Sequence, residues 1–349
     1  MDLEHPEIEG FDFRQQLAKS SRCVLWRAVQ RTLERDVLVA VFTPEVMDDW
    51  VRADALFGMV RVLAQVKSEL LPDVIDIARG AGVGYVVLED GHAEPLMAVL
   101  AGQRPEPERV LRLGIRLAEG FASLHAHHLV YGGLRPSKVY LVEGSNPVLL
   151  DFSPITFEAG FGEQAPEQAL MGSAPYVAPE QYLAPETVDT RADMFALGMT
   201  LYALCTGQVP FGAFAPEEIL ARKLREAIPS PCDVVEAFPP AFAAVLGRLT
   251  QRQAARRYGD WDEVLCDLHA VLRGDPPEGA GGSDSVIAPP NPNRRQRAER
   301  TIRLSAAELR AYRHKSFQRK GMGLGGWLAV VGAVVLALAA AGALVMLFL

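Results

Sequence analysis

The amino-acid sequence predicts a mixed α+β domain followed by one C-terminal transmembrane helix, on three observations. The apolar segment Tyr85–Glu89 follows a glycine-rich stretch, Gly80–Gly84, which is typical of a hairpin turn that leads into a strand. The segment Arg109–His128 carries apolar residues at helical spacing, so one helix face is expected to be buried in the core. The segment Trp327–Leu349 consists of 23 uncharged, mostly apolar residues.

The length of the chain and its cysteines limit the classes of protein to which it could belong. A chain of 349 residues allows one domain of about 250–270 residues with appendages. The four cysteines show neither the pairing of a disulfide framework nor the spacing of a metal site, which favours reduced residues of a cytosolic domain. They are Cys23, Cys205, Cys232 and Cys266.

Charge divides the chain into three parts. The stretch Arg294–Lys320 contains ten Lys and Arg against two acids, a net charge of +8, and Gly321–Leu349 contains no charged residue. Because the whole chain carries −8, residues 1–293 must carry −16. An acidic domain argues against nucleic acid as its partner.

The C-terminal segment is long enough to cross a bilayer. As a helix, 23 residues span about 35 Å, against roughly 30 Å of hydrocarbon. Because its basic flank lies on the N-terminal side, we expect a single-pass protein of the cell membrane whose N-terminal domain is cytoplasmic. Small residues recur at every fourth position and could mediate self-association, unless they reflect only an alanine-rich composition. These are Gly325, Ala329, Ala333, Ala337 and Ala341.

The remaining segments complete the predicted organisation. Residues 1–9 form a tail, and residues 10–273 form the main domain. Residues 274–304 are a linker, at first rich in Gly and Pro and expected to be a flexible tether, and then basic. A capping box, Ser305–Glu308, predicts a basic juxtamembrane helix over 305–320, before the transmembrane segment 321–349 with its core at 327–349. The basic residues Arg294–Lys320 could contact anionic lipids or serve only as a topology signal.

Three segments carry a resemblance to a known family. The first is Val130–Val139 (VYGGLRPSKV), the second is Asp151-Phe152-Ser153, and the third is Gly172–Glu180 (GSAPYVAPE). In this order they resemble the catalytic loop, the Asp-Phe-Gly motif and the activation-segment end of bacterial eukaryotic-like (Hanks-type) Ser/Thr protein kinases. The resemblance covers about residues 10–273. It implies a two-lobed kinase fold, with a small β-rich N-lobe over about 10–90 and a larger helical C-lobe over about 91–273.

The same resemblance indicates which catalytic groups are missing. Gly133 stands where the family has its catalytic Asp, and Lys138 stands where it has a metal-binding Asn. The phosphate-pairing Lys falls on Ala40 in the strand Val37–Phe42. Its Glu partner falls on Met59 in the helix Asp54–Val66. Two apolar residues pack together, whereas one of the two charges left alone would be costly to bury.

The nucleotide-binding residues are also reduced. Asp151 is the one retained metal- or nucleotide-binding position. The family's glycine-rich hairpin falls on Leu17–Ala28, where Ala18, Ser20 and Cys23 replace the three glycines and would crowd a nucleotide. No cofactor is therefore expected, although weak binding of ATP and Mg²⁺ is left open.

The retained residues have structural roles in the family. The resemblance implies that Asp193 braces the backbone of the catalytic loop and that Glu180 forms an ion pair with Arg256. It also implies that Tyr131 and Phe152 fill an apolar column between the lobes.

The sequence thus favours a membrane-anchored, catalytically inactive Ser/Thr protein-kinase homologue, a pseudokinase. It would act as a signalling scaffold or allosteric regulator for protein partners at the cytoplasmic face of the membrane. One alternative is an atypical active kinase or ATP-dependent transferase that uses Asp151 with rearranged residues. Another is a structural module of an envelope assembly.

Overall fold

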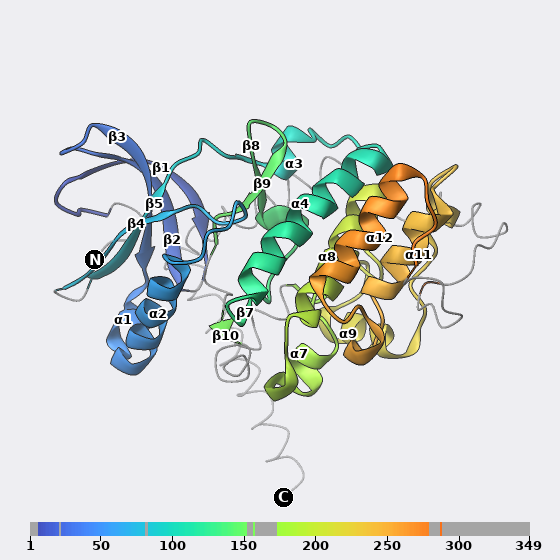
Figure 1. The fold of residues 1–349 in the computed structure, drawn as a ribbon. Helices are drawn as coiled ribbons and strands as arrows, with labels where there is room; N and C mark the ends of the chain where they lie inside the picture. The colour runs from blue at the N-terminus through green and yellow to red at the C-terminus, as the bar shows by residue number, and fades with distance from the viewer. Residues whose placement is uncertain are drawn as a thin grey trace, which may run out of the picture. The chain divides into compact units, whose positions relative to one another are not determined.

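The N-lobe is built on a five-stranded antiparallel sheet (Figure 1). The computed structural model describes residues 6–20, 22–80, 83–151, 156–157, 173–278 and 287. The strands lie in the order β1-β2-β3-β5-β4. Their bounds are Phe11–Lys19 (β1), Cys23–Gln30 (β2), Arg35–Phe42 (β3), Val74–Gly80 (β4) and Val83–Glu89 (β5). Two helices lie beside the sheet, α1 at Pro44–Asp48 and α2 at Trp50–Leu63.

Both faces of this sheet are covered, which explains why β3 is apolar without alternation. Val37, Val39 and Val41 belong to a cluster on one face, together with Phe11 and Trp26. Leu38, Ala40 and Phe42 belong to the main core cluster on the other face, together with α2 residues such as Phe57 and Met59. Since successive side chains of a strand point to opposite faces, Ala40 must lie on the face that α2 covers.

The glycine-rich stretch before β5 is a hairpin connection, as predicted. β4 ends at Gly80 and β5 begins at Val83, and these two residues are antiparallel partners. The helix that we predicted at Asp54–Val66 lies four residues earlier at its start, because α2 already begins at Trp50 and ends at Leu63.

The C-lobe is helical and is organised around α8 (Arg191–Thr206), which is buried from Ala192 to Thr206. The helix α4 packs against α8 and α12, and α11 packs against the same two helices (Figure 1). The helix predicted at Arg109–His128 is α4, with bounds Pro107–His125; it ends early because His128 has a left-handed φ of 55°. The other helices are α3 (Leu96–Val99), α7 (Glu180–Leu183), α9 (Pro216–Arg225), α10 (Pro231–Val234), α11 (Pro240–Leu249) and α12 (Trp261–Arg273).

Short strands form further small sheets beyond the five-stranded sheet of the N-lobe. A three-stranded sheet has the order β6-β8-β9, and β10 pairs with β7. A 3-10 helix at Pro136–Lys138 leads directly into β8. The bounds are Glu94–Pro95 (β6), Leu129–Val130 (β7), Val139–Val142 (β8), Asn146–Leu149 (β9) and Thr156–Phe157 (β10). The amide of Leu149 donates a hydrogen bond to the carbonyl of Leu70 at 2.7 Å, which ties β9 to the segment after α2.

One continuous apolar cluster extends from β2 and β3 through α2 to α8, α11 and α12. Ile287 belongs to it as well, since this side chain is 6% exposed and forms a parallel bridge with Ile228. Within the segment predicted as a flexible tether, Gly274–Asn293, the chain therefore contacts the C-lobe at this residue.

Several predicted features lie outside the described residues. These are Phe152, the basic stretch Arg294–Lys320, the juxtamembrane helix, the small-residue strip and the transmembrane segment. Among the helices of the described part of the chain, none has the length and hydrophobicity needed to cross a membrane.

Candidate functional site

The two positions where the resemblance expects an ion pair are filled by apolar side chains. Ala40 lies in the middle of the sheet, paired with Leu25 of β2 and Val86 of β5. Ala40 and Met59 are each 2% exposed and belong to the same core cluster. Neither position offers a charge to a phosphate, so this part of the site contributes packing alone.

The turn between β1 and β2 uses its backbone amides internally. The hydroxyl of Ser20 accepts hydrogen bonds from the amides of Cys23, at 3.0 Å, and Arg22, at 3.2 Å. It also lies 3.1 Å from the carbonyl of Cys23, to which it donates. In a glycine-rich phosphate loop such amides are directed at the ligand. Here the Ser20 side chain occupies two of them.

The thiol of Cys23 lies beside the Ser20 side chain of this turn, with 3.6 Å between the Ser20 Oγ and Cys23 Sγ atoms. The side chain is 9% exposed, and burial, followed by the nearby negative charge of Asp151, raises the pKa of the thiol to about 12. Cys23 is therefore a protonated, unreactive thiol at neutral pH. It fills the space that a glycine would leave open.

The retained carboxylate forms an ion pair with the residue that replaced the metal-binding Asn. The ammonium group of Lys138, at the end of the 3-10 helix, donates a hydrogen bond to the Oδ2 atom of Asp151. Both side chains are largely buried, with 19% of Lys138 and 10% of Asp151 exposed. The resemblance assigns these two positions to metal binding. In this structure the two side chains form an ion pair with each other, and the lysine supplies the positive charge that a metal ion would otherwise provide.

The backbone of the catalytic-loop segment is braced from α8. The carboxylate of Asp193 accepts hydrogen bonds from the amides of Tyr131, at 2.8 Å, and Gly132, at 2.7 Å. This is the contact that the resemblance implied. Burial raises the pKa of Asp193 to about 7, although the two amide hydrogen bonds act in the opposite direction. The side chain of Tyr131 is fully buried, and its ring centre lies 6.1 Å from that of Phe121.

Sequence reasoning missed two further contacts of this loop. Gln181, which is 2% exposed, donates from Nε2 to the carbonyl of Gly132 at 3.0 Å, and its Oε1 accepts from the amide of Ala178 at 2.7 Å. Arg135 donates to the hydroxyl of Ser173 at 2.9 Å. Both contacts join the loop to the end of the activation segment. A glutamine in a short helix or an arginine in a loop gives no sequence signal of such a role.

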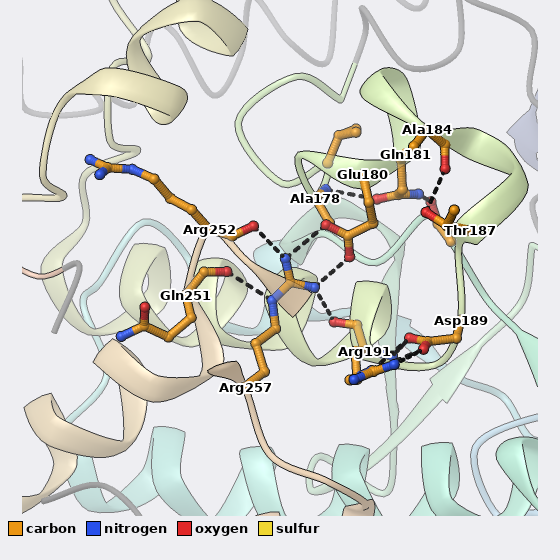
Figure 2. Close-up of polar contacts among 12 residues, drawn as sticks. Ala178, Glu180, Gln181, Ala184, Thr187, Asp189, Arg191, Gln251, Arg252 and Arg257 are labelled. Carbon is orange, nitrogen blue, oxygen red and sulfur yellow. Dashed lines mark hydrogen bonds and ion pairs between the residues drawn. The ribbon is translucent and has the colours of Figure 1, made fainter. Parts of the chain in front are cut away.

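The predicted partner of Glu180 was wrong by one residue. Glu180 pairs with Arg257, whose Nη1 and Nη2 atoms lie 2.5 and 2.8 Å from its two carboxylate oxygens (Figure 2). The Arg257 side chain is fully buried, whereas Arg256 is exposed at the end of a 3-10 helix, Ala254–Arg256. Consecutive residues point in different directions as the chain leaves this turn. The buried direction belongs to Arg257.

Arg257 also binds backbone carbonyls on three sides. It donates to Gln251 at 2.9 Å, to Arg191 at 2.6 Å and to Arg252 at 3.5 Å (Figure 2). This one side chain therefore joins the start of α8, the activation-segment end and the loop after α11.

A buried lysine on α9 was also missed. Lys223 is 3% exposed, and its ammonium donates to the carbonyl of Ala174 at 2.6 Å and to that of Val177. Burial lowers the pKa of Lys223 to about 7, and the charge of Glu180 acts in the opposite direction. The activation-segment end is thus fixed by Arg135, Gln181 and Lys223, independently of any phosphate.

Among the residues that the structure describes, no group of three or more His, Cys, Asp and Glu side chains could hold a metal ion. Two cavities lie beside α4, and none of the residues described above for this site lines them.

Comparison with known proteins identifies the family. Residues 24–267 match the protein kinase domain. A probable serine/threonine-protein kinase of Clostridium perfringens is 22% identical over 264 residues, which are 75% of this chain and 38% of that protein. The kinase PknL of Mycobacterium tuberculosis is 24% identical over 256 residues, 73% of this chain and 64% of PknL. The DNA damage-responsive kinase RqkA of Deinococcus radiodurans is 32% identical over 227 residues, 60% of this chain and 34% of RqkA.

The aligned regions cover less than two thirds of the length of each of these relatives. The match to the protein kinase domain lies within the two lobes described above. The match to the protein kinase domain extends over well more than half of the chain. The protein therefore belongs to the protein kinase family, among relatives that are bacterial serine/threonine kinases.

Proposed function

We propose that this protein is a pseudokinase, which uses the kinase fold for binding partners and does not transfer phosphate. The observation that carries the proposal is the ion pair between Lys138 and Asp151. Phosphoryl transfer requires metal ions to neutralise the charge that develops on the phosphates. A carboxylate paired with an internal ammonium group is already neutralised, and Mg²⁺ would have to displace the lysine from a largely buried site.

The other positions support the same proposal. Gly133 has no side chain that could accept a proton from a substrate hydroxyl, and Ala40 has none that could contact a phosphate. Restoring a single group would leave the others missing. Because catalysis of this reaction depends on positioning and charge stabilisation together, we expect that a single replacement does not recover activity.

The hairpin between β1 and β2, at the place where this family covers the phosphates, also disfavours the binding of a nucleotide. Ser20 occupies two amides of the turn, and Cys23 packs beneath it. A nucleotide phosphate would have to break these hydrogen bonds and approach a side chain where the family has glycine. We therefore infer weak or absent binding of Mg-ATP.

Two measurements test this part of the proposal. The first is phosphotransfer from radiolabelled ATP to generic protein substrates, with the full-length protein in detergent micelles. The expected result is no transfer above background, whereas transfer that is abolished in Asp151→Ala would refute the pseudokinase assignment. The second is a thermal unfolding series with millimolar ATP, with and without Mg²⁺, because a ligand of the native state raises the melting temperature by mass action.

The variant Lys138→Asn makes the second measurement specific. It removes the internal ammonium group and supplies an amide oxygen at the position where the family has a metal ligand. We expect the variant to gain a Mg²⁺-dependent thermal shift that the natural protein lacks. An equal shift in both proteins would show that the ion pair does not exclude the metal.

The biological role that we propose is that of a scaffold or allosteric partner at the cytoplasmic face of the cell membrane. The support comes from the sequence, in which an acidic domain is followed by a basic stretch at 294–320 and then by an uncharged segment at 327–349. Protease treatment of spheroplasts should leave the kinase-like domain intact, and carbonate washing should leave the protein in the membrane fraction. Digestion of the domain from outside would refute this topology.

A further inference from the structure

A cavity beside α4 is lined by none of the residues of the kinase-like site. Its volume is about 470 Å³, which falls in the range of small-molecule sites. Five parts of the C-lobe surround it: α3, the first half of α4, the β8–β9 hairpin, the end of α8 and the end of α12. Figure 1 shows α12 alongside α4 and the β8–β9 hairpin near α3.

The floor of the cavity is apolar. Leu100, Val110 and Leu204 line it and are between 1% and 7% exposed, and Leu113 and Leu272 line it as half-buried residues. Such a floor binds a hydrocarbon chain by removing apolar surface from water.

Three arginines of α4 line the cavity. Arg109, Arg112 and Arg116 recur at intervals of three and four residues, so they share one helix face. Arg112 is paired with Glu108 at 2.7 Å, and Arg116 lies 3.7 Å from Glu119, which also lines the cavity, and 3.9 Å from Glu69.

Of these three arginines, Arg109 is the one that an anion could approach without competing with a carboxylate. It is exposed, and among the residues that the structure describes it has no carboxylate within ion-pair distance. His269 also lines the cavity, and its Nδ1 atom lies 2.9 Å from the carbonyl of Leu265. An anionic head group at the mouth of the cavity would thus meet one guanidinium group directly.

From these features we propose that the cavity binds an amphiphilic anion with a single acyl chain. The chain lies on the leucine and valine floor, and the head group lies against Arg109. Both a free fatty acid and a lysophospholipid with an anionic head group have this chemistry. The inference is independent of whether the kinase cleft is active.

The binding would be connected to the kinase-like site through one hairpin. Leu141 of β8 lines the cavity, and β8 begins directly after Lys138, the residue paired with Asp151. A ligand that packs against this hairpin binds the folded state alone and stabilises it by mass action.

Photoaffinity labelling tests the proposal. The full-length protein, in phosphatidylcholine nanodiscs, is irradiated with a decanoate that carries a diazirine at its chain end, and the labelled peptides are mapped by mass spectrometry. We expect label on peptides from α4 and α12. Excess decanoate or lysophosphatidic acid should compete for the site, and the relative strength of the two separates a free fatty acid from a lipid head group. Decanol, which has the same chain without charge, should compete poorly.

Three variants make the result specific. Arg109→Ala should lower the labelling of these peptides by about fivefold, as expected for the loss of one exposed ion pair. Leu113→Trp should abolish it by filling the cavity, and thermal unfolding shows whether this variant is folded. Arg225→Ala, which removes an exposed arginine of α9 away from the cavity, should leave the labelling unchanged. Equal competition by decanol, label spread over other helices, or unchanged labelling in Arg109→Ala would overturn the proposal.

Discussion

The ion pair between Glu180 and Arg257 gives the most direct test of the C-lobe. In Glu180→Gln the side chain keeps its shape but loses its charge, which leaves the guanidinium group of Arg257 in a fully buried position without a compensating anion. The remaining partners of Arg257 are backbone carbonyls of Gln251, Arg191 and Arg252 (Figure 2). Carbonyls accept hydrogen bonds but do not cancel the charge. Removing one partner of a buried pair costs about 3–5 kcal/mol.

The assay is equilibrium unfolding, followed by circular dichroism as a function of temperature and of urea. At about 2–4 °C per kcal/mol for a domain of this size class, the melting temperature should fall by roughly 10 °C. The midpoint in urea should fall, while the dependence on urea concentration stays the same.

Two controls separate this ion pair from general surface effects. Glu186→Gln removes an exposed carboxylate from the same segment and should change the stability by less than about 0.5 kcal/mol. Arg256→Ala and Arg257→Ala distinguish the two neighbouring arginines. If Arg256→Ala destabilised the protein as much as Arg257→Ala, the assignment of the ion pair to Arg257 would be refuted.

Three other variants test separate features by the same unfolding assay. Asp193→Asn places an NH₂ group against the amide of Tyr131 or Gly132, so it should cost about 1–3 kcal/mol, and an unchanged stability would exclude a bracing role. Lys223→Met tests how the stability depends on pH. Because burial lowers the pKa of the Lys223 amine to about 7, the folded state binds fewer protons than the unfolded chain above pH 7. The free energy of unfolding should therefore rise between pH 7 and 9 more in the natural protein than in this variant; parallel profiles would contradict the shift. Gly120→Ala would place a Cβ atom 2.4 Å from the Cβ atom of Leu70, so it should cost about 1–3 kcal/mol despite the higher helix propensity of alanine, and a neutral effect would show that the loop can move away.

Local sequence patterns were sufficient for the frame of this protein. The apolar run in β3, the turn between β4 and β5 and the amphipathic face of α4 each follow from residues that are close in sequence. Errors at these elements were confined to their ends, where the chain turn and not the apolar pattern decides the boundary. The absence of catalytic groups stays a prediction from the resemblance, because it rests on the residue types that stand at the motif positions. The match to the protein kinase domain supports the same frame.

The sequence by itself was therefore sufficient to predict the two lobes, and it predicts which catalytic side chains this chain lacks, since both follow from residue type and order. Only the tertiary structure decided what the remaining polar groups bind. Lys138 and Asp151 are 13 residues apart, and Lys223 reaches Ala174 across 49 residues. Arg256 and Arg257 are chemically identical neighbours, and only the direction of the chain after a 3-10 turn places one in the core and the other in water. Burial and side-chain direction depend on distant parts of the chain, so a pattern of residue types cannot specify them.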